Sequence, residues 1–361
     1  MRILQVIDCL SIGGAEKNLV EIVPLLVERG FVVDVLLLNG NKTPFYYQLE
    51  KLGITNIFSL GDSYYNPKYI FKMIPYLKKY DLVHVHLFPA QYFVVLAKIL
   101  SFSKVKLLFT EHSTGNKRLN NPKLRFAEKF IDKYYSKIIC ITPQVKNILI
   151  EKLQIDHSKL LVIENGVNLK KIKNAIKYDK LNFGYNQTDV LLIMVAAFRN
   201  EKDQDTVIKT MQKLPENCKL ILVGEGARKE QLKILVNSLH LQERVNFLGI
   251  REDVYSLLKM SDIAILSSHW EGFGLAAVEA MAAGVPIIGS NVSGLAEVIG
   301  NPDLLFESGN EVDLAKKIEK LITDKIHYLK MQKYTLERSK NYDVQIMVSN
   351  HYSLYKNLIN E

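Results

Sequence analysis

Two carboxylates frame a glycine-rich stretch, with Glu271 before it and Glu279 after it. The stretch between them begins Gly272-Phe273-Gly274-Leu275. An apolar run at 263–266 precedes it and is typical of a buried parallel strand, while 276–283 is rich in helix formers and is followed by a glycine. A strand, a glycine turn and a helix direct backbone N–H groups and a helix N-terminus toward one point. The pattern predicts a phosphate site flanked by two acids.

Two cations and a histidine follow other apolar runs. Arg199 and Lys202 come after the run at 190–197, and His112 comes after the run at 105–110. Cations fixed beside a breaking phosphate bond stabilise the developing negative charge without a metal ion. A histidine at a strand end lies where open α/β sheets bind ligands. The alternative interpretation is that the cations are exposed loop residues and the histidine is structural.

Two short motifs have local explanations beside the functional ones. Gly13-Gly14 lies between the first strand and the first helix, so its N–H groups either reach a diphosphate or acceptor or form an ordinary turn. Asp203-Gln204-Asp205 superficially resembles a manganese-binding acid pair. It also begins a helix, where Asp is favoured at the N-cap and in the first turn. We expect capping there, with no metal site and no cofactor in the chain.

Short apolar strands alternate with helices along the whole sequence, which predicts parallel α/β sheets. His84 and His86 share one face of the strand at 82–86, and we expect them to line a core or cleft. Residues 165–188 are polar and lack a clear period, so they are predicted to be a linker between two doubly wound halves. The expected strands are 3–7, 32–38, 55–58, 82–86, 105–110, 137–141 and 160–163, then 190–196, 219–223, 245–248, 263–266 and 286–288.

Composition narrows the class of protein. The chain has 361 residues, enough for two domains, and its three cysteines are scattered, which suggests neither a disulfide framework nor a zinc site. No run approaches the roughly 18 apolar residues of a spanning helix, and the first apolar run is too short for a signal peptide. A cytoplasmic protein is the simplest expectation.

Positive charge is concentrated in one segment. Residues 98–137 hold ten basic and three acidic side chains, among them Lys117, Arg118, Lys123 and Arg125. Such a patch favours an anionic partner, namely membrane lipid, lipid-linked phosphate or nucleic acid; a solvated basic face is the alternative. Nucleic acid is disfavoured, because no interleaving of aromatic and basic residues of the kind found in RNA-binding modules accompanies the patch.

At Glu271 to Glu279 the sequence resembles retaining glycosyltransferases of family 4. Further stretches agree with that family in order and cover nearly the whole chain. They are Gly13-Gly14-Ala15-Glu16, Glu111-His112-Ser113, Asn165-Gly166-Val167, Val223-Gly224-Glu225-Gly226, Val245-Asn246-Phe247-Leu248-Gly249, Ser261-Asp262-Ile263 and Glu279-Ala280-Met281-Ala282-Ala283-Gly284-Val285-Pro286. The segment 261–297 is the most specific.

The resemblance implies the GT-B fold, in which two Rossmann-like domains face a central cleft. It implies an acceptor-binding domain of residues 1–165 plus 343–361, with the last helix crossing back to it, and a nucleotide-sugar-binding domain of residues 166–342. It implies that no metal is required. The family also implies that Glu279 binds the ribose hydroxyls, that Glu271 faces the donor sugar, and that the backbone of 273–275 binds the diphosphate.

The resemblance also implies roles for residues outside the segment from Glu271 to Glu279, and one of them does not match the family's usual spacing. His112 would contact the donor sugar, and the backbone at Gly249 and Ile250 would meet the base. Lys202 matches the family's diphosphate-binding lysine. The family usually has Arg five residues earlier, where this chain has Ala197, so Arg199 matches only if the loop is rearranged.

We therefore expect a retaining, metal-independent glycosyltransferase. It would move a hexose or N-acetylhexosamine from a nucleotide-diphosphate sugar, with UDP favoured over GDP, to a saccharide or lipid-linked acceptor in cell-surface polysaccharide or glycolipid synthesis. The basic segment would contact anionic lipid at the cytoplasmic face of the inner membrane. Two alternatives share the fold: a non-hydrolysing nucleotide-sugar 2-epimerase, against which the spacing of Glu271 and Glu279 argues, and a non-catalytic nucleotide-sugar-binding subunit.

Overall fold

The computed structural model describes residues 1–113, 115 and 117–360, without the side chain of Lys117. The chain forms two compact units, Met1–Gly166 with Val344–Glu361, and Val167–Asp343. They are called the N-terminal and C-terminal units below. The chain thus passes between them twice, each time one residue later than the domain limits expected from the sequence. None of the helices in the described residues is long and apolar enough to cross a bilayer.

The N-terminal unit is built on a parallel seven-stranded sheet in the order β3-β2-β1-β4-β5-β6-β7. The register places Gln5 of β1 beside His84 of β4. Its strands are β1 (Arg2–Ile7), β2 (Val32–Leu37), β3 (Ile57–Ser59), β4 (Leu82–His86), β5 (Lys106–Glu111), β6 (Lys137–Cys140) and β7 (Leu160–Val162). Its α-helices are α1 (Gly14–Glu28), α2 (Pro44–Lys51), α3 (Tyr69–Leu77), α4 (Ala90–Ser101), α5 (Pro122–Asp132), α6 (Pro143–Leu153) and α15 (Val344–Asn360).

The C-terminal unit has a parallel six-stranded sheet in the order β10-β9-β8-β11-β12-β13. Its strands are β8 (Val190–Val195), β9 (Cys218–Val223), β10 (Val245–Gly249), β11 (Ile263–Leu266), β12 (Ile287–Ser290) and β13 (Leu305–Phe306). Its α-helices are α7 (Leu169–Asn174), α8 (Gln204–Thr210), α9 (Lys229–Ser238), α10 (Val254–Met260), α11 (Leu275–Ala282), α12 (Leu295–Ile299), α13 (Glu311–Thr323) and α14 (Lys325–Ser339). The predicted α/β class and two doubly wound sheets are confirmed.

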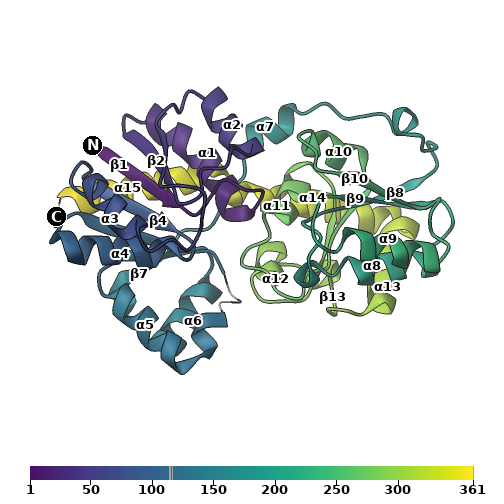
Figure 1. The fold of residues 1–361 in the computed structure, drawn as a ribbon. Coiled ribbons are helices and arrows are strands. Elements are labelled where there is room, and N and C mark those ends of the chain that lie inside the picture. The colour runs from purple at the N-terminus through teal and green to yellow at the C-terminus, as the bar shows by residue number, and fades with distance from the viewer. Residues whose placement is uncertain (114, 116, 361) are drawn as a thin grey trace. The chain divides into compact units, whose positions relative to one another are not determined.

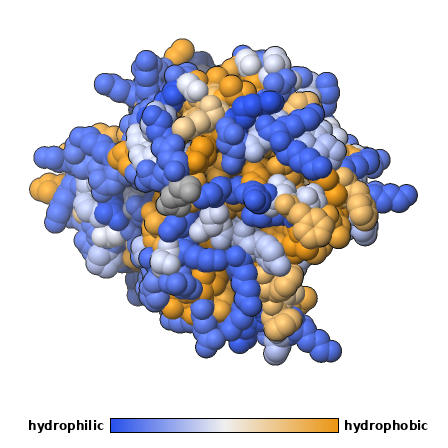
Figure 2. Space-filling view, turned by 90° about the vertical axis from the view of Figure 1, so that its left-hand side faces the viewer, coloured by the Kyte–Doolittle hydropathy of each residue, from blue (hydrophilic) through white to orange (hydrophobic). Residues whose placement is uncertain are grey.

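The last helix is part of the N-terminal core. Figure 1 shows α15, in yellow, beside the purple helix α1, which it contacts. Its Val348 and Tyr355 are fully buried in the same apolar cluster as Ile3 and Ile7 of β1. Burial of such side chains away from water is the main force that fixes the helix there. Outside the cores, hydrophobic side chains lie scattered among hydrophilic ones on the face seen in Figure 2.

The predicted linker at 165–188 is wrong. Helix α7 lies inside this range, and its Ile172 is fully buried within the C-terminal unit, where α7 contacts α11. The lysines around Ile172 hide the helical pattern, because a helix this short shows only one inward-facing apolar position. The two-residue strand β13 was not predicted either, since it is too short to have a period.

Candidate active site

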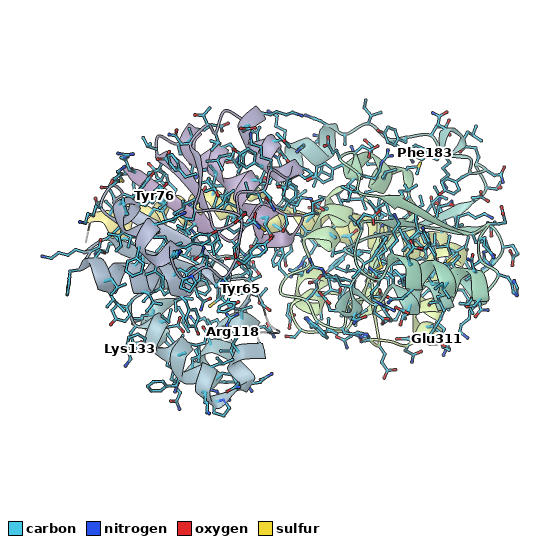
Figure 3. All side chains as sticks on the ribbon, viewed as in Figure 1. Tyr65, Tyr76, Arg118, Lys133, Phe183 and Glu311 are labelled. Carbon is cyan, nitrogen blue, oxygen red and sulfur yellow. The ribbon has the colours of Figure 1, made fainter. Side chains whose placement is uncertain are left out.

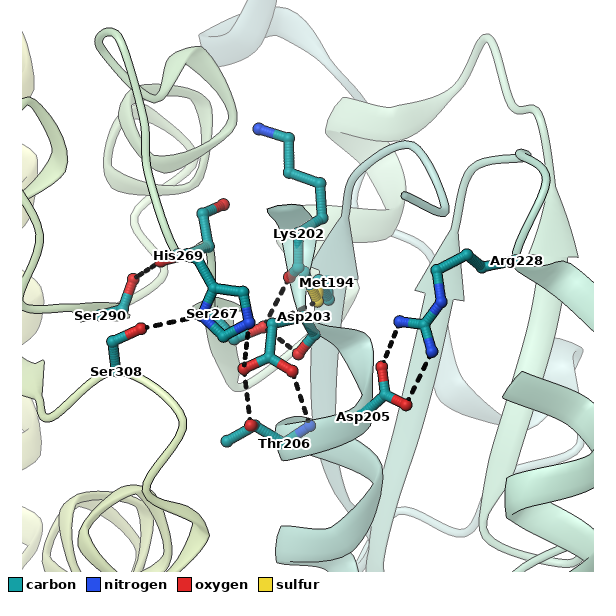
Figure 4. Close-up of polar contacts among 11 residues, drawn as sticks. Met194, Lys202, Asp203, Asp205, Thr206, Arg228, Ser267, His269, Ser290 and Ser308 are labelled. Carbon is teal, nitrogen blue, oxygen red and sulfur yellow. Dashed lines mark hydrogen bonds and ion pairs between the residues drawn. The ribbon is translucent and has the colours of Figure 1, made fainter. Parts of the chain in front are cut away.

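Two loops of the C-terminal unit are tied together at the carboxyl ends of β8 and β11. One loop contains the 3-10 helix η4 (Asn200–Lys202), and the other runs from Ser267 to Gly274. The Ser267 hydroxyl lies 2.9 Å from the carbonyl oxygen of Lys202, and the His269 N–H donates to the carbonyl of Glu201 at 2.8 Å. Figure 4 shows the Ser267 contact below Lys202, whose side chain points away from it. These hydrogen bonds hold the two loops together, and the Lys202 ammonium group takes no part in them.

The Lys202 ammonium forms an ion pair with the Glu271 carboxylate. The two side chains keep 21% and 14% of their surface exposed, so solvent still reaches the pair. A cation and an anion at the carboxyl edge of a sheet form a polar site of the kind to which such folds bind ligands. The structure thus brings together two residues that the sequence predicted for one site.

Glu279 lies in α11, the helix that follows the Ser267–Gly274 loop. Its side chain is almost completely buried, with the residue 2% exposed, and Oε1 accepts a hydrogen bond from the Tyr255 hydroxyl at 3.2 Å. Buried carboxylates require hydrogen-bond donors, because desolvation of the charge is costly. A carboxylate with two oxygens can accept further hydroxyl groups from a ligand.

Glycines shape the backbone between the two acids. Gly274 caps the N-terminus of α11 with φ +88°, a conformation that side chains rarely adopt. A Cβ added at Gly294 would lie 2.4 Å from the carbonyl oxygen of Glu271. The loop before α12 therefore packs directly against the backbone of Glu271, and a side chain at position 294 would not fit. Gly294 was not predicted as a site residue. Phe273 is buried and packs edge-on against the ring of Tyr342 at 5.3 Å, which leaves only its backbone for a ligand.

Arg199 does not join the Lys202–Glu271 pair. Its side chain is 62% exposed, and its ion pair is with the neighbouring Glu201 at 3.9 Å. Asp203 caps α8, accepting from the Thr206 hydroxyl at 2.6 Å, as predicted. Asp205 is held by both terminal nitrogens of Arg228. The pair Asp203/Asp205 is thus used locally.

Two further loops, which follow β9 and β10, lie at the same edge of the sheet. Gly249, with φ +66°, ends β10, and its carbonyl accepts from the N–H of Gly224 at 2.9 Å; the next residue, Ile250, is exposed. A Cβ at Gly224 would lie 2.1 Å from the carbonyl oxygen of Ala196. Only glycine permits this close approach of two backbone segments. The Gly224-Glu225-Gly226 motif therefore shapes the backbone of the site. Its G-x-G pattern was visible in the sequence but carried no predicted role.

The remaining predicted residues lie in the N-terminal unit. Gly13 precedes α1 and Gly14 begins it, and a Cβ at Gly13 would meet the Glu16 carboxylate at 2.3 Å. His112 directly follows β5, and its Nε2 lies 3.1 Å from Nδ1 of His86.

The predicted basic patch contains cations with different roles. Arg118 pairs with the buried Glu128 and lies 4.4 Å above the Phe88 ring. Arg125 is half-buried and donates from Nε to the carbonyl of Leu119 at 3.1 Å. Lys123 is exposed, whereas the side chain of Lys117 lies outside the described part of the chain. Arg118 and Arg125 therefore also support the local structure.

Family models match both halves of the chain. The model described as "Glycosyltransferase Family 4" matches residues 12–171, and the model described as "Glycosyl transferases group 1" matches residues 156–338. Together they include both loops of the C-terminal site and both groups of the N-terminal unit, from Gly13 to Glu279.

Individual proteins are similar over much of the chain. The N-acetyl-alpha-D-glucosaminyl L-malate synthase of Bacillus anthracis is 31% identical over 68% of this chain and 66% of its own length. An Escherichia coli protein, UDP-Gal:alpha-D-GlcNAc-diphosphoundecaprenol alpha-1,3-galactosyltransferase, is 29% identical over 60% of this chain and 59% of its own. The structure of Anabaena HepE in complex with UDP and glucose has a TM-score of 0.87 at 20% identity, covering 99% of this chain and all of that one. The chain therefore has the GT-B fold, belongs to the group 1, family 4 glycosyltransferases, and is an enzyme of that transferase class.

Proposed function

We propose that the enzyme transfers a hexose or N-acetylhexosamine from a UDP-sugar with retention of the anomeric configuration and without a metal ion. The observation that carries the proposal is the Lys202–Glu271 pair together with the buried Glu279 of the following helix, all within the part of the chain that the group 1 model matches. The Anabaena structure with UDP and the name of the E. coli relative support UDP as the nucleotide.

Each residue has a chemical role in this proposal. Glu279 accepts hydrogen bonds from the ribose hydroxyls, with Tyr255 orienting its carboxylate. When the bond between the sugar and the diphosphate breaks, negative charge develops on the diphosphate, and Lys202 and the backbone N–H groups of 273–275 stabilise it. Glu271 positions the sugar hydroxyls. Arg199 joins Lys202 only after its exposed side chain moves.

The acceptor is proposed to be a saccharide or a lipid-linked saccharide bound by the N-terminal unit. Four aromatic rings form a row there: Tyr64, Tyr65, Phe88 and Tyr92, with centroids 6.4, 6.1 and 5.4 Å apart in turn. Figure 3 shows Tyr65 and Arg118 on the same side of this unit. Tyr64, Tyr65 and Phe88 are exposed and offer ring faces for the apolar side of a sugar. The Arg118 guanidinium over Phe88 offers a cation to a phosphate.

Contact with anionic membrane is proposed for α5. This helix exposes Leu124, Phe126 and Phe130 at 42%, 76% and 41%, next to the exposed Lys123 and Lys133. Aromatic and basic side chains side by side on a helix are typical of binding at a lipid interface. This arrangement supports a peripheral position at the cytoplasmic face of a membrane.

The proposal is tested by donor binding, followed through Trp270, the only tryptophan and a neighbour of Glu271. Titration with UDP, GDP and ADP, each with and without EDTA, should show the tightest binding for UDP and no effect of EDTA. Binding should also raise the unfolding temperature by mass action. Tighter binding of GDP would overturn the choice of nucleotide, and loss of binding in EDTA would overturn metal independence.

A further inference from the structure

A continuous chain of hydrogen bonds runs through the N-terminal unit from His112 to the C-terminal helix. His112 Nε2 lies 3.1 Å from His86 Nδ1, and His86 Nε2 lies 2.9 Å from Gln5 Oε1. Gln5 Nε2 donates to the Tyr355 hydroxyl at 3.1 Å, which lies 2.6 Å from His84 Nδ1. Gln5 is fully buried and His86 is 5% exposed. Two strands, β1 and β4, the residue that follows β5 and helix α15 therefore contribute to one polar network inside an apolar core.

The acceptor and donor atoms fix the direction of this chain. The amide oxygen of Gln5 can only accept, so His86 Nε2 must carry the proton. In a neutral ring the other nitrogen, Nδ1, is then an acceptor, so His112 Nε2 must carry the proton between the two rings. A neutral His112 in turn presents Nδ1 as a lone pair. The orientation of the Gln5 amide thus determines the tautomer of His112, through the ring of His86 that lies between them.

This chain of hydrogen bonds requires neutral imidazole rings, and burial keeps them neutral. Desolvation, together with neighbouring histidines, holds the pKa of His86 well below its usual range. Desolvation likewise lowers the pKa of His112 to about 3, with His351 nearby adding to the effect. Both rings are therefore uncharged near pH 7, and each has one donor and one acceptor nitrogen.

We propose that Gln5, His86 and Tyr355 are positioning residues that hold His112 in the Nε2–H tautomer, so that its Nδ1 accepts a hydrogen bond from a hydroxyl group of the donor sugar. The inference rests on the proposed function only for the identity of the ligand. It makes specificity at this position depend on a hydroxyl proton, because a buried acceptor that loses its donor is strongly disfavoured.

The tautomer is measured directly in the free protein. Histidine labelled with ¹⁵N gives distinct shifts for the two tautomers, and comparison with His112→Gln identifies the His112 signals. We expect the Nε2–H form in the unaltered enzyme. The Nδ1–H form would overturn the proposal, since it requires the Gln5 amide and every bond along the chain to be reversed.

Three variants test the origin of the tautomer. Tyr355→Phe removes the acceptor that orients the Gln5 amide, and Gln5→Met removes the acceptor of His86, so both should give mixed His112 signals. Tyr352→Phe is the matched control, because Tyr352 lies on the same helix and packs against Phe31 without belonging to the chain. Unchanged signals in Tyr355→Phe, or in Gln5→Met should the first variant not fold, would overturn the proposal.

Kinetics separate this inference from the proposed function. With UDP-glucose, or whichever UDP-hexose is turned over, KM should rise about tenfold in Tyr355→Phe, as expected for one hydrogen bond, with a smaller change in kcat. The 6-deoxy donor should show no such rise if the hydroxyl is at C6. A shifted tautomer with an unchanged KM for every donor would overturn the positioning role. If the enzyme turns over no UDP-sugar, the proposed function is refuted. The tautomer of His112 is measured without any donor, so that result does not depend on the proposed function.

Discussion

The ammonium group of Lys202 and the carboxylate of Glu271 form an ion pair across 69 residues of sequence. Each comes from a loop at the carboxyl end of a different strand, β8 or β11, and these strands are neighbours in the sheet. The fold therefore assembles a charged pair that neither loop has alone. We expect the pair to hold both side chains ready for the donor, whose diphosphate and sugar then take over the two partners.

Replacement of Lys202 by Ala should lower kcat/KM by about 100- to 1,000-fold, because the leaving diphosphate loses a fixed cation. Steady-state kinetics with a saturating acceptor measures the effect. Lys209→Ala is the control, since Lys209 is exposed on the adjacent α8. A loss of less than tenfold would mean that Lys202 does not act on the leaving group.

Replacement of Glu279 by Gln should weaken UDP binding by about 10- to 100-fold, because hydrogen bonds from hydroxyls to a charged acceptor are replaced by neutral ones. Calorimetry at constant salt gives the dissociation constant. Tyr255→Phe should have a smaller effect of the same sign, since it only orients the carboxylate. The exposed Glu319 of α13 is the control for loss of one negative charge. Equal affinities for Glu279→Gln and Glu319→Gln would refute the ribose role.

Gly294→Ala should both destabilise the C-terminal unit and reduce activity. Gly294 has φ +88°, and a Cβ there would press on the Glu271 carbonyl. Gly309→Ala is a matched control, because Gly309 has φ +78° and no atom within 4 Å of its added Cβ. The control should lose about 1–2 kcal/mol from backbone strain alone. Unfolding followed by Trp270 fluorescence should show a larger loss for Gly294→Ala. Equal losses would show that the close contact with Glu271 is unimportant.

Phe126→Ser combined with Phe130→Ser should reduce binding to vesicles that contain phosphatidylglycerol by about tenfold or more, since burial of each ring contributes about 1.5–3 kcal/mol. Co-sedimentation at low salt measures binding, and vesicles of phosphatidylcholine alone show the electrostatic part. Phe71→Ser is the control, because Phe71 is 64% exposed on α3, away from α5 in sequence. If Phe71→Ser reduces binding as much, α5 is not the contact.

Acid should destabilise the N-terminal unit through its buried histidines. Desolvation lowers the pKa of His351 to about 4 from its usual 6.5. Between these values the unfolded chain binds the proton and the folded chain does not, so stability falls as pH falls from 6.5 toward 4. From pH 7 to pH 5 this one group should remove about 2 kcal/mol.

His351→Gln should therefore lose less stability than the unaltered protein over that interval. Hydrogen exchange of peptides from β4 measures the free energy of opening in this unit. His327→Gln, in the C-terminal unit, is the control. A pH dependence unchanged by His351→Gln would show that its ring is protonated in the folded state.

The fold was largely predictable, because each strand or helix has its own pattern of apolar residues within a short segment of the sequence. The site was predictable where a motif lies in one continuous segment, as from Glu271 to Glu279. The position of the Arg199 side chain depends on the conformation of the loop around Glu201. That loop has no repeating pattern of apolar residues from which its conformation could be predicted. The network of Gln5, His86 and Tyr355 joins residues up to 350 positions apart, and only the register of the strands reveals it. Gly294 was missed because its effect is on the backbone of another loop.

The placement of α15 affects how the protein is made. When residues 1–343 have left the ribosome, the C-terminal unit has its complete sequence and can fold, whereas the N-terminal unit still lacks the helix that contributes Val348 and Tyr355 to its core. The C-terminal unit is in this sense an insertion within the N-terminal one. The N-terminal unit is therefore completed only after the C-terminal one, and its unfinished apolar surface stays open to aggregation until α15 has been synthesised.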